Sequence, residues 1–276
     1  MGLSSNILWH QTDKKSFYDI LKSKKLLYSY CLERVIPTFH LKPVAFPMIS
    51  VSDYPFSEIA HNNWTYGNYC MGFNRSWGEK VGFSPVWYCS TGSRGLRQLD
   101  VLLKEGMKPN EKGLFRVSMF LFAQMKLDQA PLYSSKRQFR KYRFYDEREW
   151  RIVPYITETD EAEVMPFLTE EGYAEYKTNH GGGSLLDFGV DFQYDDIHYI
   201  IVELEDDVQA VKEIVGGKCH VFTKGEVMAD VVGVNHHEEI IPSPEVQDMD
   251  AGLRHLDRMR KRFEEEWKKR KSDNAN

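Results

Sequence analysis

Apolar residues occur in short runs along the first 222 residues, and polar residues or prolines end these runs. Residues 7–9 (Ile-Leu-Trp) end at His10, and residues 48–52 end at Asp53-Tyr-Pro55. Runs of this length between turn residues are typical of β-strands. No stretch reaches the 18 consecutive apolar residues of a transmembrane helix. The pattern therefore predicts a sheet of short strands and no membrane segment. Further strands are expected at 70–74, 85–89, 150–154, 197–203 and 220–222.

Between these runs, apolar residues recur at helical spacing. Phe17, Ile20 and Leu21 predict an amphipathic helix over residues 14–25, with Thr12 or Asp13 as its N-cap. Residues 93–128 predict two helices separated by Gly106–Gly113, and residues 206–215 predict another. The hydrophobic content of 42% and the charged content of 28% are ordinary for a globular protein. The fold class is therefore α+β, in a domain that spans residues 1–235.

Residues 236–276 are predicted to form a linker and a charged C-terminal helix. Leu253, Leu256, Met259, Phe263 and Trp267 form one apolar stripe. Residues 254–271 hold nine Lys or Arg and four Asp or Glu, although the whole chain carries a formal charge of −5. The helix either docks on its own domain through the stripe or binds a partner or a nucleic acid.

Pairs of polar residues lie at the ends of three predicted strands, and they are the candidate catalytic or binding residues. His10 and Thr12 follow the first strand, Ser50 and Ser52 close the second, and Glu147-x-Glu149 opens a later one. Each pair alone is ordinary: a histidine can cap a strand, and serines are common at turns. The corresponding alternative for Glu149 is a salt bridge to Arg148 or Arg151 at a sheet edge.

The order of these pairs resembles that of ADP-ribosyltransferases. Residues 8–12 (Leu-Trp-His-Gln-Thr), before a helix with Ile20-Leu21, are similar to the opening of the nicotinamide-binding half of poly(ADP-ribose) polymerases. Residues 149–153 (Glu-Trp-Arg-Ile-Val) resemble their catalytic glutamate at a strand start, and Glu147-x-Glu149 resembles the pair in toxin-type transferases. The sequence departs from the polymerase pattern at Gln11 and at Ser50 or Ser52, which replace a glycine and a stacking tyrosine.

This resemblance implies a split mixed or antiparallel sheet with inserted helices, and NAD as the substrate. Cleavage of NAD passes through an oxocarbenium-like state, which a carboxylate beside the ribose can stabilise. The implied catalytic residues are Glu149, on the ribose, and Glu147, on the acceptor. The implied NAD-binding residues are His10, Thr12, Ser50, Ser52, Tyr66 and Tyr69, of which the two tyrosines would stack on nicotinamide.

A second resemblance covers residues 7–230. The motifs that carry it are His10-x-Thr12, Pro47-Met-Ile-Ser, Asp53-Tyr-Pro, Tyr66-Gly-Asn-Tyr, Pro85-Val-Trp-Tyr and Tyr145-Asp-Glu-Arg-Glu-Trp-Arg. They resemble the AbiGi-type family of bacterial abortive-infection proteins, which is labelled as antitoxins. The two resemblances are compatible, because a phage-defence protein can be built on a transferase-like fold.

Residues 136–145 alternate five Lys or Arg with four aromatic residues. Cations for phosphates and aromatic faces for bases are how unpaired nucleic acid is bound. The segment therefore predicts an RNA or DNA acceptor held by Arg140, Lys141, Tyr142 and Arg143. The alternative is an amphipathic element whose aromatic residues are core.

The preferred hypothesis is a cytoplasmic, NAD-dependent ADP-ribosyltransferase, formally a glycosyltransferase, that acts as a toxin in anti-phage defence. Its acceptor would be a nucleic acid or a protein, and its partner a cognate antitoxin or a chaperone. The alternative is a non-catalytic antitoxin or binding module that retains the fold. A third hypothesis is a nucleic-acid-binding protein without chemistry. The N-terminus lacks a signal-peptide pattern, and no metal site is predicted.

Overall fold

A computed structural model describes residues 5–34, 43–59, 64, 66–133, 138–161, 164–180, 185 and 187–230. The predicted C-terminal helix and the domain boundary at residue 235 lie outside these residues, so both stay predictions.

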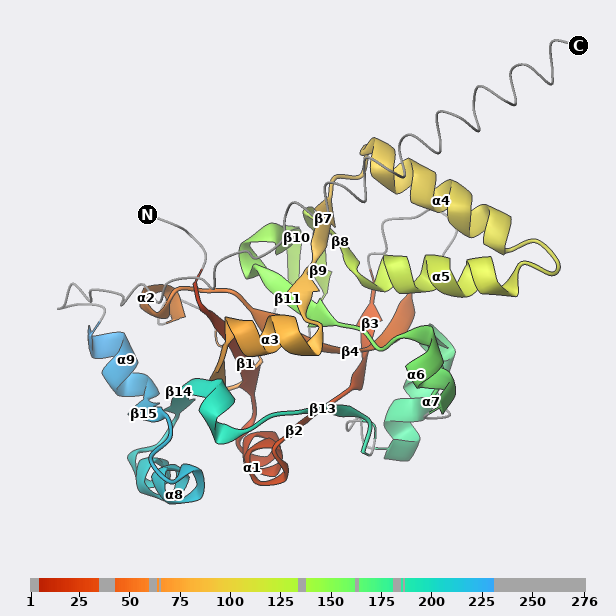
Figure 1. The fold of residues 1–276 in the computed structure, drawn as a ribbon. Coiled ribbons are helices and arrows are strands. Elements are labelled where there is room, and N and C mark those ends of the chain that lie inside the picture. The colour runs from red at the N-terminus through yellow and green to blue at the C-terminus, as the bar shows by residue number, and fades with distance from the viewer. Residues whose placement is uncertain are drawn as a thin grey trace, which may run out of the picture. The chain divides into compact units, whose positions relative to one another are not determined.

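A mixed sheet organises the described part of the chain (Figure 1). Its strands follow the order β15-β14-β5-β1-β4-β11-β6, and β3 and β12 also pair with β4. β14 and β15 are parallel, whereas the other neighbours are antiparallel. An α+β fold with a mixed sheet is thereby confirmed. The strands are β1 (Ile7–Thr12), β3 (Ser29–Glu33), β4 (Val44–Ser52), β5 (Tyr69–Asn74), β6 (Ser84–Pro85), β11 (Glu149–Ile152), β12 (Leu168–Thr169), β14 (Ile197–Val202) and β15 (His220–Thr223).

Three strand pairs lie outside this sheet: β2 with β13, β7 with β8, and β9 with β10. The predicted strand at 85–89 is thus divided, because β6 pairs with β11 while β7 pairs with β8. The bounds are β2 (Lys25–Leu27), β7 (Trp87–Cys89), β8 (Met125–Leu127), β9 (Gln129–Tyr133), β10 (Gln138–Arg143) and β13 (Gly189–Asp191).

The helices predicted within the described residues are present, and further short ones join them. The first helix begins after Asp13, whose carboxylate accepts a hydrogen bond from the Ser16 amide, and it ends at Lys24 in the left-handed conformation. The α-helices are α1 (Lys14–Ser23), α2 (Phe56–Ile59), α3 (Arg75–Val81), α4 (Arg94–Gly106), α5 (Lys112–Ala123), α6 (Ile156–Glu161), α7 (Glu170–His180), α8 (Glu205–Val215) and α9 (Lys224–Asp230). Two 3₁₀ helices are η1 (Phe144–Glu147) and η2 (Tyr194–Asp196). No helix in the described ranges is long and apolar enough to cross a membrane.

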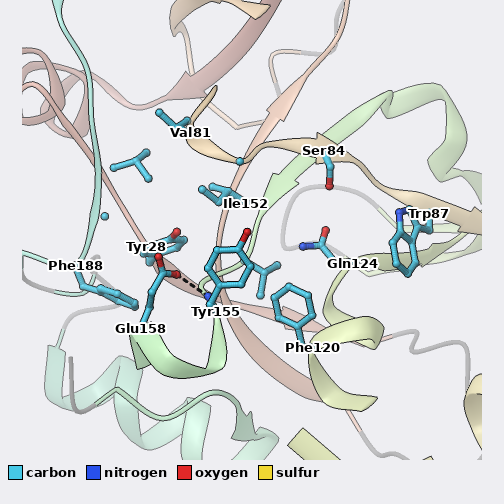
Figure 2. A pocket seen from close by; sticks show the side chains of 14 residues that line it. Tyr28, Val81, Ser84, Trp87, Phe120, Gln124, Ile152, Tyr155, Glu158 and Phe188 are labelled. Carbon is cyan, nitrogen blue, oxygen red and sulfur yellow. Dashed lines mark hydrogen bonds between the residues drawn. The ribbon is translucent and has the colours of Figure 1, made fainter. Parts of the chain in front are cut away.

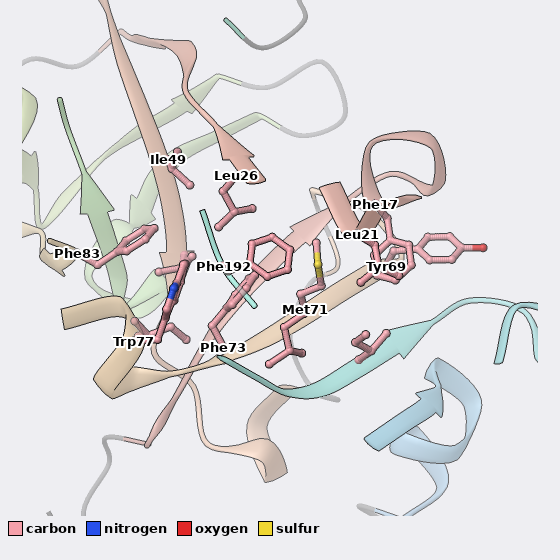
Figure 3. Close-up of a cluster of buried hydrophobic side chains, with 14 of the residues drawn as sticks. Phe17, Leu21, Leu26, Ile49, Tyr69, Met71, Phe73, Trp77, Phe83 and Phe192 are labelled. Carbon is pink, nitrogen blue, oxygen red and sulfur yellow. The ribbon is translucent and has the colours of Figure 1, made fainter. Parts of the chain in front are cut away.

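The sheet separates several apolar clusters because its side chains alternate between two faces. On β1, Leu8 joins the largest core, whereas Ile7 and Trp9 join a cluster on the other face. The largest core contains Phe17 and Leu21 of α1 (Figure 3). The first half of β4 packs instead against α4 and α5.

The strand predicted at residues 48–52 is longer than expected, because β4 begins at Val44 and runs through Pro47. Pro47 pairs with Tyr30 of β3, whereas β11 joins β4 only from Ile49 onward. A proline, which lacks an N–H donor, is tolerated where a strand is paired on one side only.

Candidate functional site

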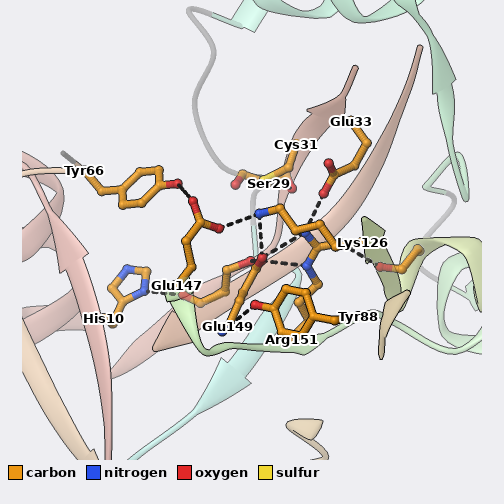
Figure 4. A network of polar contacts seen from close by, with 12 residues as sticks. His10, Ser29, Cys31, Glu33, Tyr66, Tyr88, Lys126, Glu147, Glu149 and Arg151 are labelled. Atoms are coloured by element: carbon orange, nitrogen blue, oxygen red, sulfur yellow. Dashed lines mark hydrogen bonds and ion pairs between the residues drawn. The ribbon is translucent and has the colours of Figure 1, made fainter. Parts of the chain in front are cut away.

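Three of the polar motifs meet on neighbouring strands. β4 lies between β1 and β11, and Ser52 pairs with both Trp9 and Glu149. The His10 ring lies with Nδ1 3.2 Å from the Ser50 carbonyl oxygen, and the Ser50 hydroxyl donates to Glu149 Oε1 at 2.7 Å. Residues that are 40 and 99 positions apart in sequence thus form one network (Figure 4).

Glu149 occupies the centre of this network. It follows Arg148, whose φ of 45° places a non-glycine residue in the left-handed region and turns the chain into β11. Arg151 donates from Nε to Oε1 at 2.6 Å and from Nη2 to Oε2 at 3.0 Å. Lys126 donates to Oε2 at 2.9 Å. With the Ser50 hydroxyl, four donors reach the two carboxylate oxygens, and Glu149 is only 8% exposed.

Arg151 is the cation that compensates this buried carboxylate. It is 1% exposed, and it also donates to the Ala123 carbonyl at 3.0 Å and to the Glu33 carboxylate. The expected alternative, a salt bridge from Glu149 to Arg151, is therefore present, but in the interior and not at an open edge. Arg148 instead lies 3.6 Å from Asp53.

Glu147 joins the network through Lys126. The Lys126 ammonium is 2.6 Å from Glu147 Oε2, and it lies 4.7 Å from the centre of the Phe144 ring. The Tyr66 hydroxyl is 3.5 Å from Glu147 Oε1. The cluster combines the carboxylates of Glu33, Glu147 and Glu149 with the cations of Lys126 and Arg151, so its formal charge is −1.

The protonation of these groups follows from their burial and their partners. Burial alone would raise the pKa of Glu149, but Arg151 and Lys126 outweigh that effect and hold the pKa well below its usual value. Burial would lower the pKa of Lys126, yet the nearby glutamates raise it. Burial lowers the pKa of His10, which favours a neutral imidazole.

Tyr66 reaches Glu147 from a loop that requires a glycine. Gly67 has a φ of 149°, and a Cβ there would lie 1.9 Å from the Thr12 carbonyl oxygen. The end of β1 and this loop are therefore in close backbone contact, which places the ring of Tyr66 beside the cluster with 66% of its surface exposed.

The structure does not bring every candidate residue to this cluster. Tyr69 lies in the largest core with 1% exposure, and its hydroxyl donates to Asp207 Oδ2 at 2.5 Å. Thr12 pairs with Tyr69 at the C-terminal end of β1, and its carbonyl group is packed against Gly67. The predicted stacking role is thus compatible with the position of Tyr66, whereas the Tyr69 ring is enclosed by core side chains.

Residues 138–147 form β10 and η1. The Tyr142 ring packs edge-on against Phe144 at 5.0 Å, and burial together with Glu147 raises the pKa of Tyr142 to about 12. Tyr142 therefore faces the cluster, whereas Tyr145 of the same segment is 55% exposed. The exposed Arg143 lies 3.4 Å from Asp146. The side chains of Arg140 and Lys141 lie outside the described set, so nucleic-acid binding stays a prediction.

Sequence reasoning missed Lys126, Tyr88 and Glu33. Lys126 stands between Met125 and Leu127, and this alternation is ordinary for a strand with one solvated face, so no local signal indicates that Lys126 is buried. Tyr88 accepts a hydrogen bond from the Glu149 amide at 2.9 Å, and it lies in the Pro85-Val-Trp-Tyr motif. No local pattern marks Glu33.

The low pKa of Glu149 predicts an effect on acid stability. In the unfolded chain Glu149 takes up a proton near pH 4.5, whereas in the folded chain its pKa is lower. The ionised carboxylate therefore stabilises the folded state above that pH, and this stabilisation is lost as the pH falls. We expect the difference in unfolding free energy between the wild type and Glu149→Gln to narrow below about pH 4.5. Urea unfolding of both proteins from pH 7 to pH 3 measures this difference. The other carboxylates are the same in both proteins, so their effect on acid stability cancels in the difference. A difference in unfolding free energy that stays constant with pH would contradict the low pKa of Glu149.

Comparison with known proteins identifies the family. No curated protein and no solved structure matches the chain. A family model described as "Putative abortive phage resistance protein AbiGi, antitoxin" matches residues 21–203, which is more than half of the chain. The match includes Ser50, Tyr66, Lys126 and the Glu147–Arg151 segment, whereas His10 precedes it. The chain belongs to the AbiGi family of abortive phage resistance proteins.

Proposed function

We propose that this protein acts in abortive phage infection as an antitoxin-type binding module, in which the Glu149 cluster maintains the fold. The observation that carries this proposal is the saturation of the Glu149 carboxylate. An ionised carboxylate offers about four acceptor positions. Four donors from Ser50, Lys126 and Arg151 already use them. A carboxylate in this state has no acceptor position left for a ribose hydroxyl.

The surroundings of Glu149 oppose a rearrangement. Arg151 is held on three sides, by Glu149, Glu33 and the Ala123 carbonyl, and it is almost fully buried. Releasing one partner of a buried ion pair leaves an uncompensated charge, which costs several kcal/mol. The same carboxylate that would catalyse a reaction is thus a structural anchor, which fits the family's description as an antitoxin.

NAD-dependent ADP-ribosyl transfer is the second candidate function. The observation that favours it is the meeting of His10, Ser50 and Glu149 on three adjacent strands, beside the exposed ring of Tyr66. The formal charge of −1 would also favour a developing positive charge on the ribose. In this case Glu149 must exchange its contact with Ser50 or Lys126 for a ribose hydroxyl.

Growth assays separate the two candidates. An antitoxin expressed alone leaves growth unchanged, and it restores growth when it is co-expressed with a toxin encoded beside it. A toxic transferase arrests growth alone, and Glu149→Gln relieves the arrest. Tyr66→Ala, which removes an exposed side chain, is the companion variant that leaves the buried cluster intact. Arrest by the wild type that both variants relieve would overturn the antitoxin proposal.

A further inference from the structure

A cavity of about 620 Å³ lies beside the C-terminal end of β11 and the edge strand β6. Ile152 and Val153 line it, whereas none of the charged residues of the Glu149 cluster is among its lining residues. Its volume is within the range of pockets that hold small organic ligands. The cavity is therefore separate from the candidate site described above.

Aromatic rings form much of the wall (Figure 2). Phe120 and Tyr155 stack with ring centres 6.3 Å apart and planes 18° from parallel. Tyr155 and Trp87 are 65% and 48% exposed, so their rings form an accessible rim. Tyr28 and Phe188 line the wall at the other side. Such surfaces favour a flat ring that can stack on them.

One polar group in the cavity lacks a partner. Gln124 is 7% exposed, and its side-chain oxygen, Oε1, has no hydrogen-bond partner among the described residues. Figure 2 shows its amide pointing into the space between Tyr155 and Trp87. A buried carbonyl oxygen without a donor is costly, and a ligand that carries an N–H would satisfy it.

The charges of the wall limit the class of ligand. Glu158 is the ionisable acid of the lining, and none of the described lining residues is Lys, Arg or His. A phosphate would meet no cation here and would face a carboxylate. The ligand is therefore planar, carries an N–H donor and lacks a phosphate.

We propose that this cavity binds a nucleoside, a purine or pyrimidine base with its sugar and without phosphate. The base stacks on the aromatic rim at Tyr155, and one of its N–H groups donates to Gln124 Oε1. The sugar occupies the remaining volume, where its hydroxyls reach the Glu158 carboxylate. This inference does not depend on the proposed antitoxin function, since the cavity and the cluster use different residues.

Calorimetric titration of the full chain with adenosine, guanosine, cytidine and uridine tests the proposal. We expect at least one to bind, and its 5′-monophosphate to bind no tighter. Gln124→Leu and Tyr155→Ala should each weaken binding about tenfold or more, since each removes one hydrogen bond or one stacking surface. Tyr145→Ala, an exposed tyrosine outside the cavity, is the matched control and should leave the affinity unchanged.

Melting temperature distinguishes loss of binding from loss of folding. Gln124→Leu removes an unpartnered buried acceptor, so it should keep or raise the melting temperature while it weakens binding. The proposal is overturned if none of the four nucleosides binds at millimolar concentration. It is equally overturned if both cavity variants bind as tightly as the wild type, or if the monophosphate binds more tightly than its nucleoside.

Discussion

Replacing Arg151 with methionine should lower the free energy of unfolding by about 3–5 kcal/mol, the usual cost of removing one partner from a buried ion pair. Methionine keeps much of the side-chain volume, so the effect reports on charge. The variant leaves the carboxylates of Glu149 and Glu33 in the interior, with Lys126 as the nearest described cation. Urea unfolding followed by circular dichroism measures the change.

Two comparisons make this result specific. The control is Arg34→Met, which breaks the exposed ion pair with Glu170 and should cost about 1 kcal/mol or less. In the second comparison, the double variant Glu149→Gln with Arg151→Met should lose less than the sum of the two single variants, because the residues interact directly. A loss below about 1 kcal/mol for Arg151→Met would show that the cluster does not stabilise the fold. Additive effects would show that Glu149 and Arg151 do not stabilise each other.

Removing the carboxylate of Asp207 should cost about 2–4 kcal/mol. Asp207 lies in the first turn of α8 and is 6% exposed. It accepts from Tyr18 at 2.9 Å and from Tyr69 at 2.5 Å, and it pairs with Lys14 at 2.8 Å. These contacts tie α8 to α1 and β5, so Asp207→Ala leaves the two tyrosine hydroxyls without their acceptor. Thermal and urea unfolding give the magnitude.

Tyr69→Phe is the informative companion variant. It keeps the aromatic ring and removes only the hydroxyl, so a residue needed for stacking alone would tolerate it. We expect a measurable loss of about 1–2 kcal/mol, since the hydroxyl bonds to a buried carboxylate. Asp195→Ala, which breaks an exposed pair with Lys218, is the surface control. Equal stability of Tyr69→Phe and the wild type would contradict the structural role of this hydrogen bond.

The local sequence pattern was sufficient to predict those helices and strands whose structure depends on residues within the same element. The apolar spacing of Phe17, Ile20 and Leu21, with Thr12 or Asp13 as the expected cap, predicted α1, and the segment between Gly106 and Gly113 contains the turn between α4 and α5. The run Ile197–Val202 likewise predicted β14. These features depend on interactions within a few residues, which a sequence displays directly.

The features that the local pattern did not predict depend on contacts with segments distant in sequence. Pro47 remains within a strand because of which neighbours β4 has at that position, and residues 85–89 divide because their pairing partners differ. At the candidate site, the sequence predicted His10, Ser50 and Glu149 as candidate residues at strand ends. It could not show that Lys126 donates to Glu149, because this contact between residues 23 positions apart depends on the tertiary position of β8.

Release of nicotinamide from NAD is the most direct test of the claim that Glu149 is a structural anchor. The purified full chain is incubated with NAD, and free nicotinamide is measured by chromatography beside Glu149→Gln and a protein-free blank. The saturated carboxylate predicts that the wild type and the variant both match the blank. Release by the wild type that falls about 10²–10³-fold in a folded Glu149→Gln variant would contradict the account and assign Glu149 a catalytic role.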